Sequence, residues 1–267
     1  MSSDRLRTQI NFEHILSGNN EAVWLSLTKG QIKSFIFNAT HVALFESAML
    51  DDCLDFYYKG IISLNEGIIA TNKKNFSWAT VKLYYSVYYL LRCSLCCNRL
   101  GFVRKERDGY YFENNISHKP IALGKPDHMA AIDLFKNYFA ATDFLQSNNI
   151  NGTNPYEWLR HQRENINYRY RTFFEPDIPI MWETISQECD NGSLDFWIER
   201  YISDDIYSFL DDHAVLALPI RRLMLTHADL ISKGFAITVK PEKLIKLNQF
   251  IAENDYLKRL RPYYRGA

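Results

Sequence analysis

The segment Trp158-Leu-Arg-His-Gln-Arg-Glu-Asn-Ile-Asn-Tyr-Arg-Tyr-Arg-Thr-Phe-Phe-Glu-Pro176 carries the densest set of charged and hydrogen-bonding side chains in the chain. At 100° per residue, one narrow arc of a helix through it holds Arg160, Glu164, Asn167 and Arg171. Another side gathers Leu159, Ile166, Tyr170 and Phe173. This separation predicts an amphipathic helix with one apolar face and one exposed polar stripe.

The flanking residues predict where this helix begins and ends. Asn154 is a suitable N-cap, and Pro155 fits the first helical position because its missing N–H has no helical partner there. Pro176 stops the pattern, since the residue before a proline resists the helical conformation. We therefore expect a short, bounded helix that reaches almost to Pro176.

The polar stripe has two interpretations. Arg160 and Glu164 are four residues apart and can form an ordinary surface ion pair. Alternatively, three arginines beside an Asn and a His form a patch rich in donors, and arginine binds phosphate oxygens in a bidentate manner that lysine does not match. A phosphodiester is the natural ligand for such a patch.

Composition sets wide bounds on the function. With 267 residues, of which 47% are hydrophobic, the chain can bury a sizeable core. Its 31 Lys and Arg equal its 31 Asp and Glu, so any contact with nucleic acid or anionic lipid must come from a local patch. The first residues lack the apolar core of a signal peptide, and the longest apolar stretch, Leu83 to Leu91, is too short to span a membrane. We expect a soluble, cytoplasmic protein that does not bind membranes.

Helical periodicity dominates the first half of the chain. Residues 1–40 suggest a short helix, a turn at 17–20 and a possible strand at 33–37. One long helix is predicted from a Thr40 cap to about Ala70, and a second from a Ser77 cap to about Arg99. The second is apolar nearly all round, which predicts a central buried position. Its Lys82 and Arg92 need polar surroundings, which the Arg160 face can supply.

Residues 101–117 change character and predict a small β-hairpin around the turn dipeptide Asp108-Gly109. Asp127 is expected to cap the next helix. Further helices are predicted near 194–211, at 214–233 with Pro219 as a kink, and from 241 to about 260, with a short strand at 235–239. The predicted fold is mainly α: an antiparallel helical bundle at 41–176, with the hairpin inserted, an N-terminal extension at 1–40 and a C-terminal helical extension at 177–267.

Five cysteines in a chain of this length, without a regular spacing, are expected to be reduced. Cys93, Cys96 and Cys97 form a cluster, but a zinc site needs further ligands, and the candidates, Cys53, Cys189, His118 and His128, have no zinc-binding spacing. We expect buried thiols, with no metal and no cofactor. The motifs of nucleotide hydrolases, dehydrogenases and serine hydrolases are missing from the sequence.

The helix pair and the motif together resemble the HEPN superfamily. The family pattern is an Arg, a polar residue and, some four to six positions later, a His or Asn. Here Arg160 and His161 are followed by Asn167, with six residues between Arg160 and Asn167, and Arg163-Glu164 to Asn167 is a shorter alternative. The layout at 43–101, two long antiparallel helices followed by a loop containing glycine, also resembles a HEPN core, and the whole resemblance covers about residues 41–176. The usual closing histidine is replaced by Asn167, whose amide can orient or donate a hydrogen bond but cannot titrate near neutral pH.

The resemblance implies a metal-independent endoribonuclease of the toxin or antiviral-defence type. Arg160, Arg163 and Asn167 would then be catalytic, and the residues expected to bind RNA are His161, Glu164, Tyr168, Arg171 and His118. It also implies a homodimer that pairs its motif helices. The alternative is a non-catalytic sensor or interaction module, which binds a nucleic acid, a nucleotide or a protein encoded by a neighbouring gene through the Arg160 face.

Overall fold

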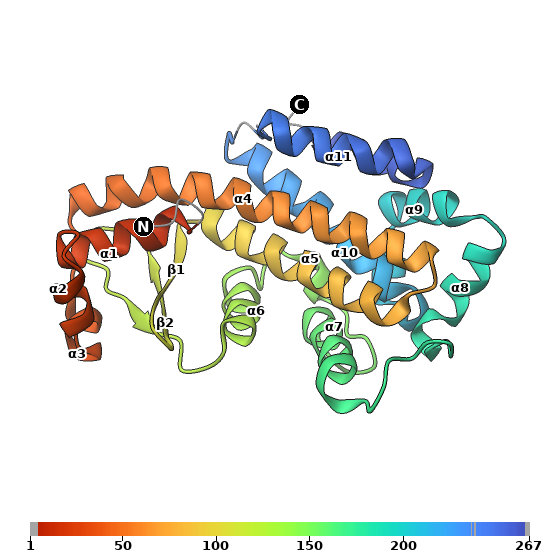
Figure 1. The fold of residues 1–267 in the computed structure, drawn as a ribbon, viewed down its shortest axis with the longest axis horizontal. Coiled ribbons are helices and arrows are strands. Elements are labelled where there is room, and N and C mark those ends of the chain that lie inside the picture. Colours follow the sequence, from red (N-terminus) through yellow and green to blue (C-terminus); the bar gives the residue numbers. More distant parts are fainter. Residues whose placement is uncertain (1–4, 236, 238, 265–267) are drawn as a thin grey trace.

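A computed structural model describes residues 5–235, 237 and 239–264 of the chain. Helices account for 69% of it, and the sheet is a small one of three strands. The predicted mainly α class with a small β insertion is therefore confirmed. The molecule is elongated, and two long helices run through its middle (Figure 1).

The central pair consists of α4 (Ala39–Asn72) and α5 (Phe76–Cys97), which pack against each other along their length. Two glycines of α4 permit this closeness, because a Cβ added at Gly60 or Gly67 would meet a leucine side chain of α5 within 2.8 Å. Both predicted caps were wrong by two residues. Asn38, in place of Thr40, caps α4 by accepting a hydrogen bond from the backbone N–H of His41 at 2.9 Å. Helix α5 already begins at Phe76, before Ser77.

Helix α5 is buried on nearly every side, as its sequence predicted, because other helices cover the faces that α4 leaves open. These are α6 (Asp127–Tyr138), α7 (Pro155–Glu164) and α10 (Asp211–Ser232), the last of which continues through Pro219 (Figure 1). Asp127 is the first residue of α6 and not its cap, which is Pro126. The buried Arg222 of α10 lies 3.3 Å from Asp143 and 3.2 Å from Asp229.

The described part of the N-terminal segment, residues 5–40, forms helices and no strand. Helix α1 (Arg7–Ser17) lies along α4 and β1, and it is followed by α2 (Glu21–Ser26) and α3 (Lys29–Ser34) (Figure 1). The strand predicted at 33–37 was wrong. A capping box at Thr28 starts α3, which includes residues 33 and 34, and the buried ring of Phe37 packs against Phe45 and Phe112. The carboxylate of Asp52 on α4 accepts hydrogen bonds from the backbone N–H groups of Arg7 and Thr8, which anchors the start of α1.

The insertion is a three-stranded antiparallel sheet in the order β1-β2-β3. Its strands are β1 (Leu100–Lys105), β2 (Asp108–Glu113) and β3 (Ile121–Ala122). The predicted turn was displaced: Lys105 pairs with Asp108, so Glu106 and Arg107 make the turn, and Glu106 has a φ of 54°. Gly109 instead allows a close approach, since an added Cβ would lie 2.6 Å from the Leu123 side chain.

The helices predicted near 194–211 and from 241 to about 260 are shorter than predicted. Helices α8 (Glu183–Asp190) and α9 (Leu194–Ser203) are followed by a separate 3-10 turn at Ile206–Phe209, and α11 (Pro241–Glu253) by a 3-10 segment at Asp255–Tyr264. Phe235, Ile237 and Val239 lie in no strand, and residues 236 and 238 of that predicted strand are outside the described residues. The division of the chain into 1–40, 41–176 and 177–267 stays a prediction.

Candidate functional site

The helix of the Arg160 motif is shorter than its pattern predicted. The Asn154 side chain caps α7, as predicted, by accepting from the N–H of Tyr156 at 3.1 Å. After Glu164 the backbone widens into a π-helical turn, Asn165–Arg169, and Tyr170 is extended. The prediction that Arg171 and Phe173 continue the helical arcs was therefore wrong. Both follow the end of the helix and are exposed.

The segment after this turn is held against the start of α5. The Glu175 carboxylate accepts from the backbone N–H of Ser77 at 2.7 Å and from its hydroxyl at 2.8 Å. Ser77 Oγ in turn accepts from the N–H of Phe174 at 3.0 Å. Ser77, predicted as a cap, thus fixes the chain that leaves the motif, which explains why the helix ends well before Pro176.

Arg160 is engaged with its neighbours on α7. Its Nη1 lies 2.5 Å from Glu164 Oε1, and its Nη2 lies 2.8 Å from His161 Nε2. The side chain of Arg160 is only 13% exposed, so it is more enclosed than a solvated stripe would be. The ion pair expected from the four-residue spacing is present, and it offsets much of the charge of Arg160.

Arg163 lies in a group of tyrosines. Its Nη2 donates to the hydroxyl of Tyr85 at 2.9 Å, and its guanidinium lies 5.6, 5.5 and 5.1 Å from the ring centroids of Tyr84, Tyr85 and Tyr168. These distances allow cation–π attraction. Tyr168 is 72% exposed. The arrangement therefore presents an open aromatic ring beside a cation that the protein holds in place.

His128 of α6 joins the same tyrosines from the other side. Its Nδ1 lies 3.0 Å from the Tyr84 hydroxyl, and its ring centroid is 4.3 Å from that of Tyr88 and 5.7 Å from that of Tyr85. Burial lowers the pKa of His128, and the charge of Arg163 acts in the same direction. The imidazole is therefore neutral at neutral pH and able to accept a proton.

In the sequence, His128 was a candidate only for binding zinc. A signal for its role was present in the spacing of Tyr84, Tyr85 and Tyr88, which places aromatic rings along α5. It gave no indication of which helix would cover those rings. That is decided by how α6 and α7 both pack on α5.

Several predicted residues are not brought to this site. His118 lies at the hairpin, where its carbonyl accepts from the N–H of Phe37 at 3.0 Å and its Nδ1 is 3.8 Å from Glu113. Lys82 pairs with Glu66, and Arg92 is buried beside Phe56 and Phe102, so neither contacts Arg160. Asn167 is half-buried on the π turn.

The cysteine cluster is buried, and all five cysteines are free. Cys53 of α4 faces Cys93 of α5 with a sulfur to sulfur distance of 3.4 Å. Burial raises the pKa of the Cys93 and Cys96 thiols, so they are protonated at neutral pH and are weak metal ligands in that form. Within the described residues, no three His, Cys, Asp or Glu side chains are grouped to hold a metal ion.

Comparison of the chain with protein-family models, curated proteins and solved structures finds no match. In the described part of the chain, no helix has both the length and the apolar character needed to cross a membrane.

Proposed function

We propose that this chain is a HEPN-like RNA-binding protein that cleaves RNA without a metal ion, with its site between α6 and α7. The observation that supports this best is the meeting of His128 and Arg163 on one pair of tyrosines. RNA cleavage by its own 2′-hydroxyl needs a group that accepts a proton and a cation that stabilises the phosphate charge. These two residues supply both.

In the proposed reaction the 2′-hydroxyl attacks the adjacent phosphorus, and the bond from phosphorus to the 5′-oxygen breaks. The products are a 2′,3′-cyclic phosphate and a 5′-hydroxyl end. Neutral His128 accepts the 2′-hydroxyl proton on Nε2, while its Nδ1–H donates to the Tyr84 hydroxyl. Water protonates the leaving 5′-oxygen. Arg163 stabilises the negative charge that develops on the phosphate oxygens.

The other motif residues take binding roles. Tyr168 offers an exposed ring on which a base can stack, and such stacking is tolerant of base identity. Arg160 forms an ion pair with Glu164 and a hydrogen bond with His161, and these contacts fix the three side chains on the surface of α7. Asn167 donates a hydrogen bond to the sugar or phosphate, because an amide has no proton to exchange near neutral pH.

A homodimer that pairs two copies of α7 belongs to the same proposal. Large apolar side chains are exposed on the segment after α7 and on the start of α5: Tyr170, Phe173, Ile178, Ile180 and Trp78. Trp78 and Phe173 contact each other edge to face at 5.4 Å. A second copy can cover this surface, and an interface of ordinary size buries about 1,600 Å². Light scattering at micromolar concentration should give twice the 31.4 kDa chain mass, and a strict monomer would refute the dimer.

The second candidate function is a binding module without catalysis. The ion pair of Arg160 and Glu164 favours it, because a paired arginine has less charge to offer to a transition state. In that case the same face binds a nucleic acid, a nucleotide or a protein from a neighbouring gene, and no RNA is cut.

One assay separates the two functions. A fluorescently labelled RNA is incubated in EDTA with the wild type, His128→Gln, Arg163→Gln and the matched control Arg169→Gln, and binding is measured in parallel. Arg169 is an exposed arginine of the same π turn. An enzyme loses about 10²-fold or more in rate when a preorganised group is removed. Binding without any cleavage by the wild type would reject catalysis and leave the module.

A further inference from the structure

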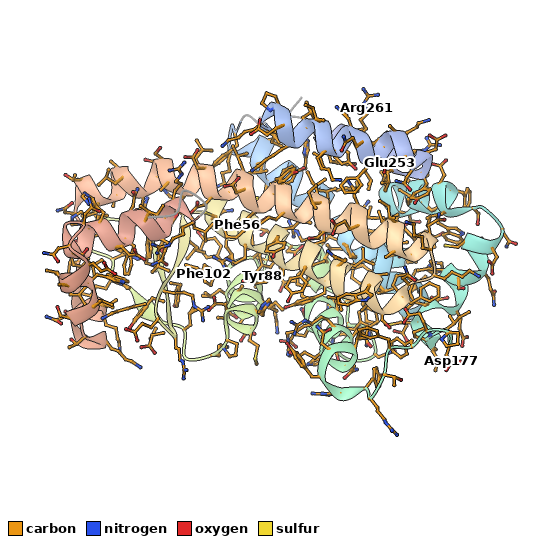
Figure 2. The ribbon with its side chains drawn as sticks, viewed as in Figure 1. Phe56, Tyr88, Phe102, Asp177, Glu253 and Arg261 are labelled. Carbon is orange, nitrogen blue, oxygen red and sulfur yellow. The ribbon has the colours of Figure 1, made fainter. Side chains whose placement is uncertain are left out.

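Arg92, in the second half of α5, is a buried cation at some distance along the helix from the Arg163 group. It is 7% exposed, and its guanidinium lies between two aromatic rings, 4.7 Å from the Phe56 centroid and 4.1 Å from the Phe102 centroid. Figure 2 shows Phe56, Phe102 and Tyr88 side by side where α4, α5 and β1 meet. Nη1 of Arg92 donates to the Tyr88 hydroxyl at 3.0 Å.

The charge of Arg92 has no carboxylate partner among the described residues, within the 4.0 Å that defines an ion pair. Asp52 shares a small hollow with Arg92, but its oxygens accept from the backbone N–H groups of Arg7 and Thr8. Of the five N–H donors of a guanidinium, the hydrogen bond to Tyr88 uses one. Because an unpaired buried charge is costly, this arrangement calls for an anion.

Arg92 faces a cavity of about 380 Å³, which is within the range of pockets that hold small molecules, about 300–1,000 Å³. Its apolar wall consists of Leu6, Trp24, Phe102, Val103 and Leu123. The charged residues that line the cavity largely cancel: Arg5 pairs with Glu13, Arg104 lies 3.6 Å from Asp127, and Glu106 is exposed. The buried, uncompensated charge of the cavity is therefore that of Arg92.

We propose that this cavity binds a small organic carboxylate with an aromatic or apolar body. Phe56 and Phe102 lie beside the guanidinium, and the hydrogen bond to Tyr88 uses one of its N–H donors, so a ligand in the cavity meets the remaining edge of donors. That edge matches a carboxylate in bidentate geometry, and one positive charge balances one carboxylate. The apolar wall accepts the body of the ligand. This site does not rest on the proposed RNA cleavage, because it uses none of the same ligand-contacting residues.

The first test uses the wild type and two fluorinated probes of one shape, 4-fluorophenylacetate and its neutral amide, 4-fluorophenylacetamide. Fluorine NMR should show saturable broadening of the carboxylate signal, with the amide at least about tenfold weaker, since charge-assisted hydrogen bonds are the stronger ones. Equal binding of the two probes, or no binding of the carboxylate at millimolar concentration, would overturn the proposal. Tighter binding of inorganic phosphate or adenosine monophosphate would overturn the assignment to carboxylates.

Variants then locate the site. Arg92→Met should weaken carboxylate binding by about tenfold or more, whereas Arg104→Gln at the rim should change it by less than about threefold. If circular dichroism shows that Arg92→Met does not fold, Leu6→Trp takes its place, because it fills the cavity and keeps Arg92. Undiminished binding by a folded Arg92→Met, or by Leu6→Trp, would place the carboxylate elsewhere and reject the site.

Discussion

The hydroxyl of Tyr84 lies 3.0 Å from Nδ1 of His128, and this contact joins α5 to α6 at the candidate site. Burial raises the pKa of Tyr84 far above neutrality, so its hydroxyl stays protonated in the physiological range. The contact therefore orients the imidazole and does not transfer a proton away from it. Nε2 of His128 is left for the proposed chemistry.

His128 should titrate below an ordinary histidine, whose pKa is about 6.5. Burial is the larger cause of this lowered pKa, and the charge of Arg163 lowers it further. The variant Arg163→Gln should therefore raise the pKa of His128 in an NMR titration. A histidine acts as a base only when it is neutral. The rate of RNA cleavage should therefore fall as the pH falls through this lowered pKa. Stability should also fall below about pH 6.5, because the unfolded chain takes up a proton that the folded chain resists. An unchanged titration in Arg163→Gln would contradict the proposed proximity.

Arg163→Ala should cost about 1–3 kcal/mol of unfolding free energy, because it removes a hydrogen bond to Tyr85 and cation–π contacts with the surrounding rings. Arg169→Ala, on the exposed side of the same turn, should cost within about 0.5 kcal/mol. Urea denaturation measures both. Equal and small effects would mean that the contacts of Arg163 with Tyr85 and the surrounding rings add little to stability.

The cysteine cluster should be unreactive in the folded protein. Cys53, Cys93, Cys96 and Cys97 are buried, and burial raises the pKa of the remaining Cys189 to about 11. Because the thiolate is the reactive form, iodoacetamide at pH 8 should label the native chain slowly and label five cysteines after denaturation. Elemental analysis should find no stoichiometric zinc. One zinc per chain, lost in Cys96→Ser and Cys97→Ser, would show that the cluster binds metal.

Periodicity predicted the parts of this fold that depend on burial over many turns. The nearly all-apolar sequence of α5 placed it at the centre, and Asn154 with Pro155 fixed the start of α7. The end of α7 could not be predicted in the same way. It depends on Glu175 bonding to Ser77, a contact between residues 98 positions apart. A local pattern carries no information about such a partner.

The candidate site shows the same difference between local patterns and contacts that depend on packing. The pattern found Arg160, Arg163 and Glu164 because they lie close together on one helix. It did not select His128, which contacts the tyrosines of α5, and it selected His118, which lies at the hairpin. Arg92 shows a related limit. The sequence predicted polar surroundings for its charged side chain, whereas the structure places the rings of Phe56 and Phe102 beside it.

The last prediction concerns Arg222, whose side chain is 2% exposed between Asp143, also 2% exposed, and the more open Asp229. Arg222→Met should cost about 3–5 kcal/mol, because it leaves the buried Asp143 carboxylate without its counter-charge. Arg259→Met serves as the control, since Arg259 pairs with Asp195 at the surface and its loss should leave the denaturation midpoint nearly unchanged.

The source of that cost can be isolated in the double variant. Asp143→Asn added to Arg222→Met removes the stranded charge and keeps the oxygen that accepts from the Tyr156 hydroxyl. It should therefore recover part of the lost stability, measured as a coupling energy in a double-mutant cycle. Losses that simply add would show that Arg222 stabilises the helices through its packing, and that the buried pair with Asp143 is energetically neutral.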